Sequence, residues 1–157
     1  MSIDVDGNDY WIWEAIQSVS PRIVVCEYNS IFGPDACVAI PYDPYFERSK
    51  AHYSWLYFGA SLPALCHLAS NKGYDFVGSN SMGTNAFFVR KDLNHKMQKL
   101  TAREGYVSST NRMDSRDIHG NFTHVGGVER LKLVQDLPVV DILTNRTIFI
   151  TELVNKQ

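Results

Sequence analysis

The sequence predicts an α/β protein, and three consecutive segments near its start support this class. Residues 1–5 are apolar and β-branched, residues 9–19 place apolar side chains at helical spacing, and residues 22–28 form a continuous apolar run. A strand, a helix and a strand within about 30 residues form a βαβ unit, so the two strands should pair in parallel with a right-handed crossover. The uniform apolarity of the second run predicts a strand that is covered on both faces.

The next part of the chain predicts a long loop, a helix and a hairpin. Residues 30–60 are rich in Pro, Tyr, Asp and Gly, with a short strand near residues 37–44. Loops of this length in compact domains are usually lids or binding loops. Residues 62–73 predict a helix, and residues 74–91 predict two antiparallel strands joined by a tight turn.

These segments divide the chain into two regions. Residues 1–92 predict a partial doubly wound, Rossmann-like sheet that is mostly parallel and ends in an antiparallel hairpin. Residues 93–157 predict a C-terminal extension of mixed structure. Within this extension, residues 127–137 are helix-like, and residues 138–154 are strand-like or mixed.

Composition restricts the partners. The net charge is −2 and the pI is about 6.2, which gives no electrostatic reason to expect a nucleic acid or an anionic membrane as partner. No apolar run approaches the ~20 residues that span a bilayer, and we expect no signal peptide. Three cysteines at unrelated spacing, Cys26, Cys37 and Cys66, predict reduced thiols and a cytoplasmic location.

Acidic side chains follow both strands of the predicted βαβ unit. Asp4 and Asp6 follow the first strand, and Glu27 ends the second. Ligands of open α/β sheets bind outside the carboxyl ends of the strands, so these acids should share one crevice. They could orient an acceptor hydroxyl and take its proton, or hold a metal. Alternatively, Asp6 caps the helix and Glu27 stabilises a turn.

Five further polar residues are candidates for binding a substrate. Asn8 and Asn29 lie beside the acids in sequence, and each could instead serve a helix cap or a turn. Asn80 and Asn85 flank the hairpin turn, where turn chemistry is the favoured interpretation. His52 lies in the long loop, where a histidine could act as a base but more often only packs. The histidines show no metal-ligand spacing, so we expect no metal centre.

The order of these segments resembles the C-terminal half of a class I S-adenosylmethionine-dependent methyltransferase of the FkbM type. The residues that carry the resemblance are "SIDVDGND", "RIVVCEYN" and "TNAFFVRK", within residues 2–91. In that family an Ile-Asp-x-Glu-Gly signature ends one strand, a Glu ends the next, and an Asn-Ala-hydrophobic-Phe-Val-Arg segment forms the last, antiparallel strand. Asp6 stands where the family usually has Glu. The resemblance implies an O-methyltransferase that acts on a hydroxyl of a small molecule or sugar, with S-adenosylmethionine as cofactor.

The motifs that bind the cofactor in such enzymes are absent from this sequence. The resemblance implies a glycine-rich turn after a first strand and an acid after a second, and neither occurs here. We therefore expect a fragment that lacks the cofactor-binding half and does not bind S-adenosylmethionine by itself. The first strand would then expose an unpaired edge, through which the chain should pair with itself or with a partner chain.

Other classes of protein stay open. "IDVDGND" also resembles the first motif of the haloacid-dehalogenase phosphatases, in which Asp4 would attack phosphorus and Asp6 would act as acid or base with magnesium. A calcium loop and the Asp-x-Asp of glycosyltransferases match fewer positions. A non-catalytic interaction module that completes a sheet on a partner is the alternative without any enzyme activity.

Overall fold

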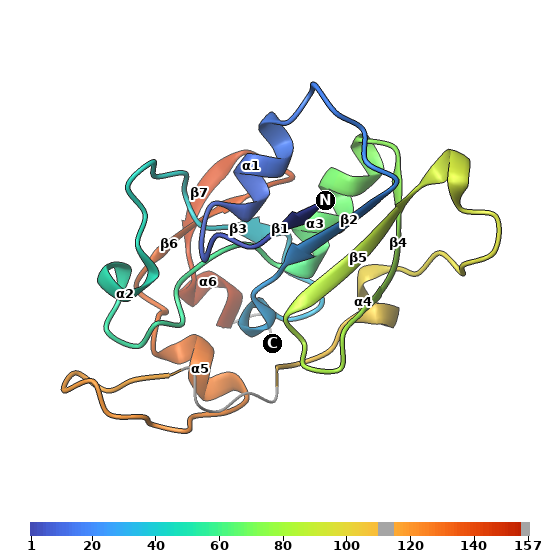
Figure 1. Ribbon diagram of the computed structural model, residues 1–157. Helices are drawn as coiled ribbons and strands as arrows, with labels where there is room; N and C mark the ends of the chain where they lie inside the picture. Colours follow the sequence, from blue (N-terminus) through green and yellow to red (C-terminus); the bar gives the residue numbers. More distant parts are fainter. Residues whose placement is uncertain (110–114, 155–157) are drawn as a thin grey trace.

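Two β-sheets and six α-helices form the part of the chain that the computed structural model describes, residues 1–109 and 115–154 (Figure 1). The elements are, in chain order, β1 (Ser2–Ile3), α1 (Asp9–Ala15), β2 (Ile23–Glu27), η1 (Ser30–Phe32), β3 (Val38–Ala39), α2 (Arg48–Ala51), α3 (Leu62–Asn71), β4 (Tyr74–Ser79), β5 (Asn85–Arg90), η2 (Lys91–Leu93), α4 (Ala102–Gly105), α5 (Val128–Lys132), β6 (Pro138–Asp141), β7 (Arg146–Phe149) and α6 (Thr151–Val154). The fold is therefore mixed α/β. None of the described helices is long and apolar enough to cross a bilayer.

The first sheet has the strand order β1-β2-β5-β4. β1 and β2 pair in parallel, with Ser2 opposite Val25, which confirms the predicted parallel pair. β5 runs antiparallel to both β2 and β4, which confirms the predicted hairpin. Only one of the three pairings is parallel, but β1, β2 and β4 run in the same direction and β5 alone runs against them, so the sheet is mixed with a single reversed strand.

Helices α1 and α3 cover one face of this sheet. Trp13 of α1 lies against Phe88 and Tyr74, with ring centroids 4.9 Å and 5.9 Å away. α3 begins where Ser61 Oγ accepts a hydrogen bond from the Ala64 amide, so Ser61 is its N-cap. Side chains from α1, α3 and the inner face of the sheet thus form the first hydrophobic core.

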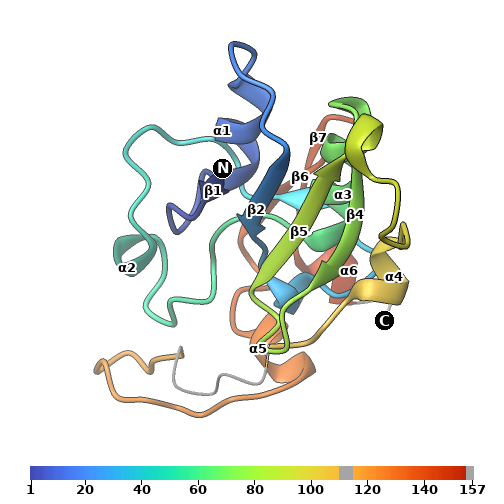
Figure 2. The same ribbon diagram turned by 45° about the vertical axis from the view of Figure 1, so that its right-hand side comes forward.

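The opposite face of the sheet is only partly covered. Val25 and Phe87 are half-buried there, and Ile23 is 49% exposed. Figure 2 shows no helix of the described chain in front of β2 and β5. The prediction that β2 is covered on both faces is therefore wrong. β2 is paired with an antiparallel strand and has one buried face, which is the usual arrangement of antiparallel sheets.

The second sheet joins a short strand of the long loop to two strands near the C-terminus. Its order is β3-β6-β7, with Val38 of β3 opposite Asp141 of β6. β6, β7 and α6 lie in the predicted C-terminal extension, whose strand-like and helix-like segments are confirmed. A second core forms where Leu131, Val139 and other side chains of the extension pack with buried residues of the first region. All three cysteines are free thiols, Cys26 buried and the other two half-buried.

Candidate functional site

Acidic side chains gather at the carboxyl ends of β1 and β2. The two strands are parallel neighbours, so Asp4, which follows β1, and Glu27, which ends β2, lie at the same edge of the sheet. The negative charges of Asp4, Asp6 and Asp9 all raise the pKa of Glu27. We call these four residues the acid site. The hairpin turn between β4 and β5 and helix α5 lie at the same end of the sheet (Figure 1).

Glu27 is the chemically distinctive member of the acid site. Its side chain is half-buried, and its Oε2 atom is buried with no hydrogen-bond partner among the described residues. Burial and the nearby charges of Asp4 and Asp9 raise the pKa of Glu27 to about 8, although the guanidinium of Arg48 opposes the shift. Glu27 therefore carries a proton at neutral pH and can exchange it near that pH.

Asp9 is fully buried and has a structural role in the site. Its two carboxylate oxygens accept hydrogen bonds from the backbone amides of Val5 and Gly7, each at 3.0 Å. Burial raises the pKa of Asp9 in spite of these two bonds. Asp9 thus fixes the turn between β1 and α1. The sequence suggested a helix cap at Asn8, whereas Asn8 precedes α1 without a side-chain capping bond.

Asp6 is exposed and forms an ion pair with Arg48. The Arg48 Nη1 atom lies 3.0 Å from Asp6 Oδ1. The same side chain donates from Nε to the Trp55 carbonyl at 2.7 Å, and its guanidinium lies 3.7 Å from the centroid of the Phe58 ring. Sequence reasoning missed Arg48, because a lone arginine in a long polar loop carries no pattern that would distinguish it.

The long loop packs against the turn that carries the acids. Asn8 Nδ2 donates to the Asp43 carbonyl at 2.7 Å. Gly7 lies so close to the Phe46 ring that a Cβ atom there would overlap the ring. Together with the ion pair of Asp6 and Arg48, these contacts place residues 43–48 beside the acid site. The position of the loop agrees with the lid or binding loop that its length suggests.

Asn29 connects the end of β2 to this loop. Its buried amide donates to the carbonyls of Leu56 and Phe58, at 2.8 Å and 3.0 Å, and accepts from the Ile31 amide. Both amide hydrogens are therefore used within the fold. This arrangement favours the turn interpretation of Asn29 over substrate binding.

We expect Asn29→Ala to lower the free energy of unfolding by about 2–3 kcal/mol, because two buried carbonyls and one half-buried amide lose their partner. Urea denaturation measures the change. Asn71→Ala is the matched control, since the Asn71 amide is exposed and bonds only the His67 ring among the described residues. Equal losses in the two variants would contradict the role of Asn29.

The remaining candidates make local contacts. The His52 Nδ1 atom lies 2.7 Å from Ser54 Oγ, and burial lowers the pKa of His52. His52 is absent from the groups that act on the Glu27 charge. Asn80 Oδ1 accepts from the amides of Thr84 and Asn85, which is turn chemistry. Asn85 stands opposite Glu27 in the sheet register and so lies beside the acid site.

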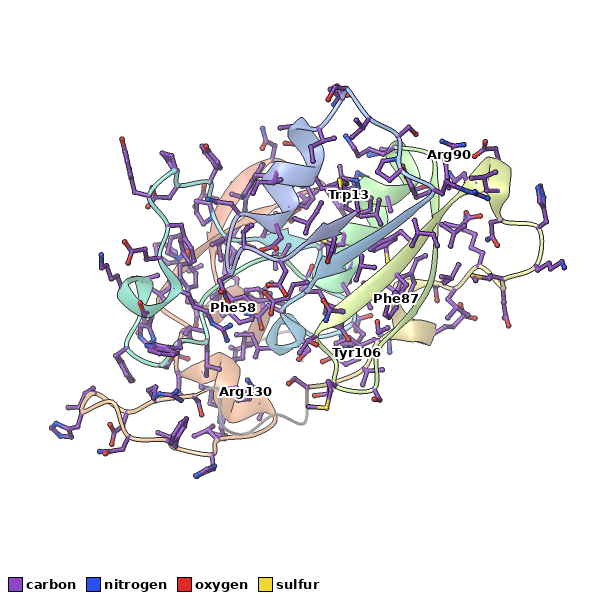
Figure 3. The ribbon with its side chains drawn as sticks, viewed as in Figure 1. Trp13, Phe58, Phe87, Arg90, Tyr106 and Arg130 are labelled. Atoms are coloured by element: carbon purple, nitrogen blue, oxygen red, sulfur yellow. The ribbon has the colours of Figure 1, made fainter. Side chains whose placement is uncertain are left out.

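A small cavity of about 90 Å³ opens beside Glu27. The hairpin turn contributes Gly83 and Thr84 to its wall, and the long loop contributes Arg48 and Phe58. Arg130 of α5 also lines it, and Figure 3 shows Phe58 and Arg130 beyond the carboxyl end of β2. Its size suits one small functional group. Pockets for whole small-molecule ligands are usually about 300–1,000 Å³.

The acid site does not fit the groups that the sequence patterns implied. The cavity beside Glu27 is too small for S-adenosylmethionine, so the described residues do not form a pocket for that cofactor there. Among residues 1–109 and 115–154, no three His, Cys, Asp or Glu side chains are placed to hold a metal ion.

Fold and site together define a mixed α/β protein with a cluster of carboxylates at the carboxyl edge of a mixed sheet. No protein-family model matches the chain, and neither the curated proteins nor the solved structures contain a significant match.

Proposed function

We propose that this chain is a methyltransferase-like protein, in which Glu27 takes the proton from a hydroxyl of a small molecule or sugar that accepts a methyl group. The observation that carries the proposal is the buried Oε2 atom of Glu27, which has no partner among the described residues, in a side chain that lines a cavity sized for one functional group. An acceptor hydroxyl would supply the missing hydrogen-bond donor. The parallel pair β1–β2 and the antiparallel hairpin β4–β5 also agree with the Rossmann-like half-sheet that the sequence resemblance implies.

The chemistry of the acid site supports a general base. Transfer of a methyl group to oxygen requires that the hydroxyl lose its proton, and a base works best when its pKa lies near the working pH. Burial and the charges of Asp4 and Asp9 raise the pKa of Glu27 to about 8, within that range. Asp4 would help to orient the hydroxyl, and the ion pair of Asp6 with Arg48 would hold the loop in place. The cavity beside Glu27 has no room for the methyl donor, so we derive no step at the donor.

The test is transfer of a radiolabelled methyl group from S-adenosylmethionine, at millimolar concentration, to a panel of sugars and small alcohols. We expect transfer to rise with pH toward about 8, following ionisation of Glu27, and Glu27→Gln to lower its rate by about 10²-fold or more. Asp92→Asn is the matched control, because Asp92 is an exposed acid that pairs with Arg90 at the other end of β5.

Absence of transfer, or transfer that is equal in wild type and Glu27→Gln, would contradict the proposal. Hydrolysis of p-nitrophenyl phosphate that needs magnesium and is lost in Asp4→Asn would favour a phosphatase instead. Calorimetric titration with S-adenosylmethionine adds a second check. We expect no micromolar binding by the chain alone, and such binding would show that the cofactor site lies elsewhere on it.

A further inference from the structure

A second, larger hollow adjoins the acid site. Its volume is about 450 Å³, and we call it the Trp55 groove after the exposed aromatic residue in its wall. Its wall also contains Val5, Asp6, Phe46, Glu47 and Arg48. Asp6 and Arg48 line the groove, and their charges also shift the pKa of Glu27, Asp6 upward and Arg48 downward. The groove and the acid site are therefore continuous through this ion pair.

Trp55 is held in an unfavourable backbone conformation that keeps its ring at the surface. Its φ is 62°, in the left-handed region that bulky residues rarely adopt. The conformation is fixed by the Trp55 amide, which donates to the His52 carbonyl at 3.0 Å, and by the Trp55 carbonyl, which accepts from Arg48. The Arg116 guanidinium lies 4.5 Å from the ring centroid, and the residue remains 37% exposed. Such strain persists only where surrounding structure imposes it, and it is common at ligand sites.

The lining of the groove selects one chemical class of ligand. A wholly apolar ligand would remove the charged side chains of Asp6, Glu47 and Arg48 from water, which is costly even though each has an ion-pair partner. An anion would meet the carboxylates of Asp6 and Glu47, and a cation would meet the guanidinium groups of Arg48 and Arg116. A neutral ring with many hydroxyls avoids both conflicts. Its apolar C–H face can lie on an aromatic ring while its hydroxyls bond the charged groups.

We infer that the Trp55 groove binds a neutral sugar ring and positions one of its hydroxyls toward the acid site. The volume lies within the usual range of small-molecule pockets. This inference names the acceptor class of the proposed methyltransferase-like site and depends on that proposal for its role. The binding itself is measured without methyl transfer.

The experiment titrates the full chain with D-glucose, D-galactose and maltose, followed by ¹H–¹⁵N NMR. We expect millimolar binding by at least one sugar, with shifts at the Trp55 indole and at residues 46–48. Trp55→Ala should weaken binding at least tenfold, and Trp55→Phe, which keeps a flat ring, should retain part of it. Phe149→Ala is the control, because Phe149 is similarly exposed but lies on β7 of the second sheet.

Two results would overturn the inference. One is the absence of shifts at Trp55 with every sugar. The other is stronger binding of choline or of glucose 6-phosphate than of the neutral sugars, which would assign the groove to a charged ligand. Sugar binding without methyl transfer to any sugar or small alcohol would support the groove and contradict the proposed reaction. Methyl transfer to a small alcohol without any sugar binding would support the reaction and contradict the groove. The two proposals therefore fail separately.

Discussion

Trp13→Ala should lower the free energy of unfolding by about 4 kcal/mol. Trp13 is 1% exposed, and its ring packs between α1 and the sheet against Phe88 and Tyr74. Removing a buried aromatic side chain costs about 3–5 kcal/mol, because both its transfer from water and its packing are lost. Urea denaturation followed by far-ultraviolet circular dichroism measures the change.

Tyr45→Ala is the control for this prediction. Tyr45 is 87% exposed, so its substitution should lower the free energy of unfolding by less than about 0.5 kcal/mol. A loss below about 1 kcal/mol in Trp13→Ala would mean that α1 does not pack on the sheet as described. The βαβ unit and the acid site at its end would then lose their support.

Glu27→Gln should remove a large pH dependence of stability. The folded protein raises the pKa of Glu27 to about 8 by burial and by the charges of Asp4 and Asp9, from an ordinary value of 4.5. Between these two values the folded state binds a proton that the unfolded state releases. The stability of the wild type should therefore fall as pH rises from about 4.5 to about 8.

The size of the effect follows from the shift. One pKa unit corresponds to about 1.4 kcal/mol, and residual contact with water reduces the full value. As pH rises, we therefore expect the free energy of unfolding of the wild type to fall by about 3 kcal/mol more than that of Glu27→Gln. Urea denaturation of both proteins at several pH values between 5 and 9 measures the difference. Asp92→Asn should show the same fall in stability as the wild type over this range, because it keeps Glu27, and Arg90 lowers the pKa of Asp92 so that its own titration lies in acid. Parallel curves for wild type and Glu27→Gln would contradict the raised pKa.

Local pattern was sufficient to predict the first sheet. Apolar runs and helical spacing gave β1, α1, β2, α3 and the β4–β5 hairpin, and the parallel pairing of β1 with β2 followed from the short crossover between them. The coverage of the second face was not predictable in the same way. A continuous apolar run indicates burial on both faces, whereas β2 has half-exposed side chains on one face.

The acid site was predictable only in part. Acids directly after two parallel strands had to meet at one edge, and Glu27 and Asp4 do so. Arg48 and Asp9 were not recognised as members of the site. Asp9 bonds backbone amides of the turn that precedes it, and Arg48 reaches the acids only because the long loop folds back against that turn. Such loop placement depends on tertiary contacts that one sequence does not reveal.

The pairing of β3 with β6 has a consequence for how the chain folds. Val38 and Asp141 lie about a hundred positions apart along the chain, so closing the loop between them carries a large entropic penalty before any ladder bond forms. During synthesis, β3 can pair only after β6, about a hundred residues further along the chain, has emerged, whereas the β4–β5 hairpin needs only local sequence. We expect refolding to show a fast phase from the hairpin region and a slower phase in which β3 pairs with β6.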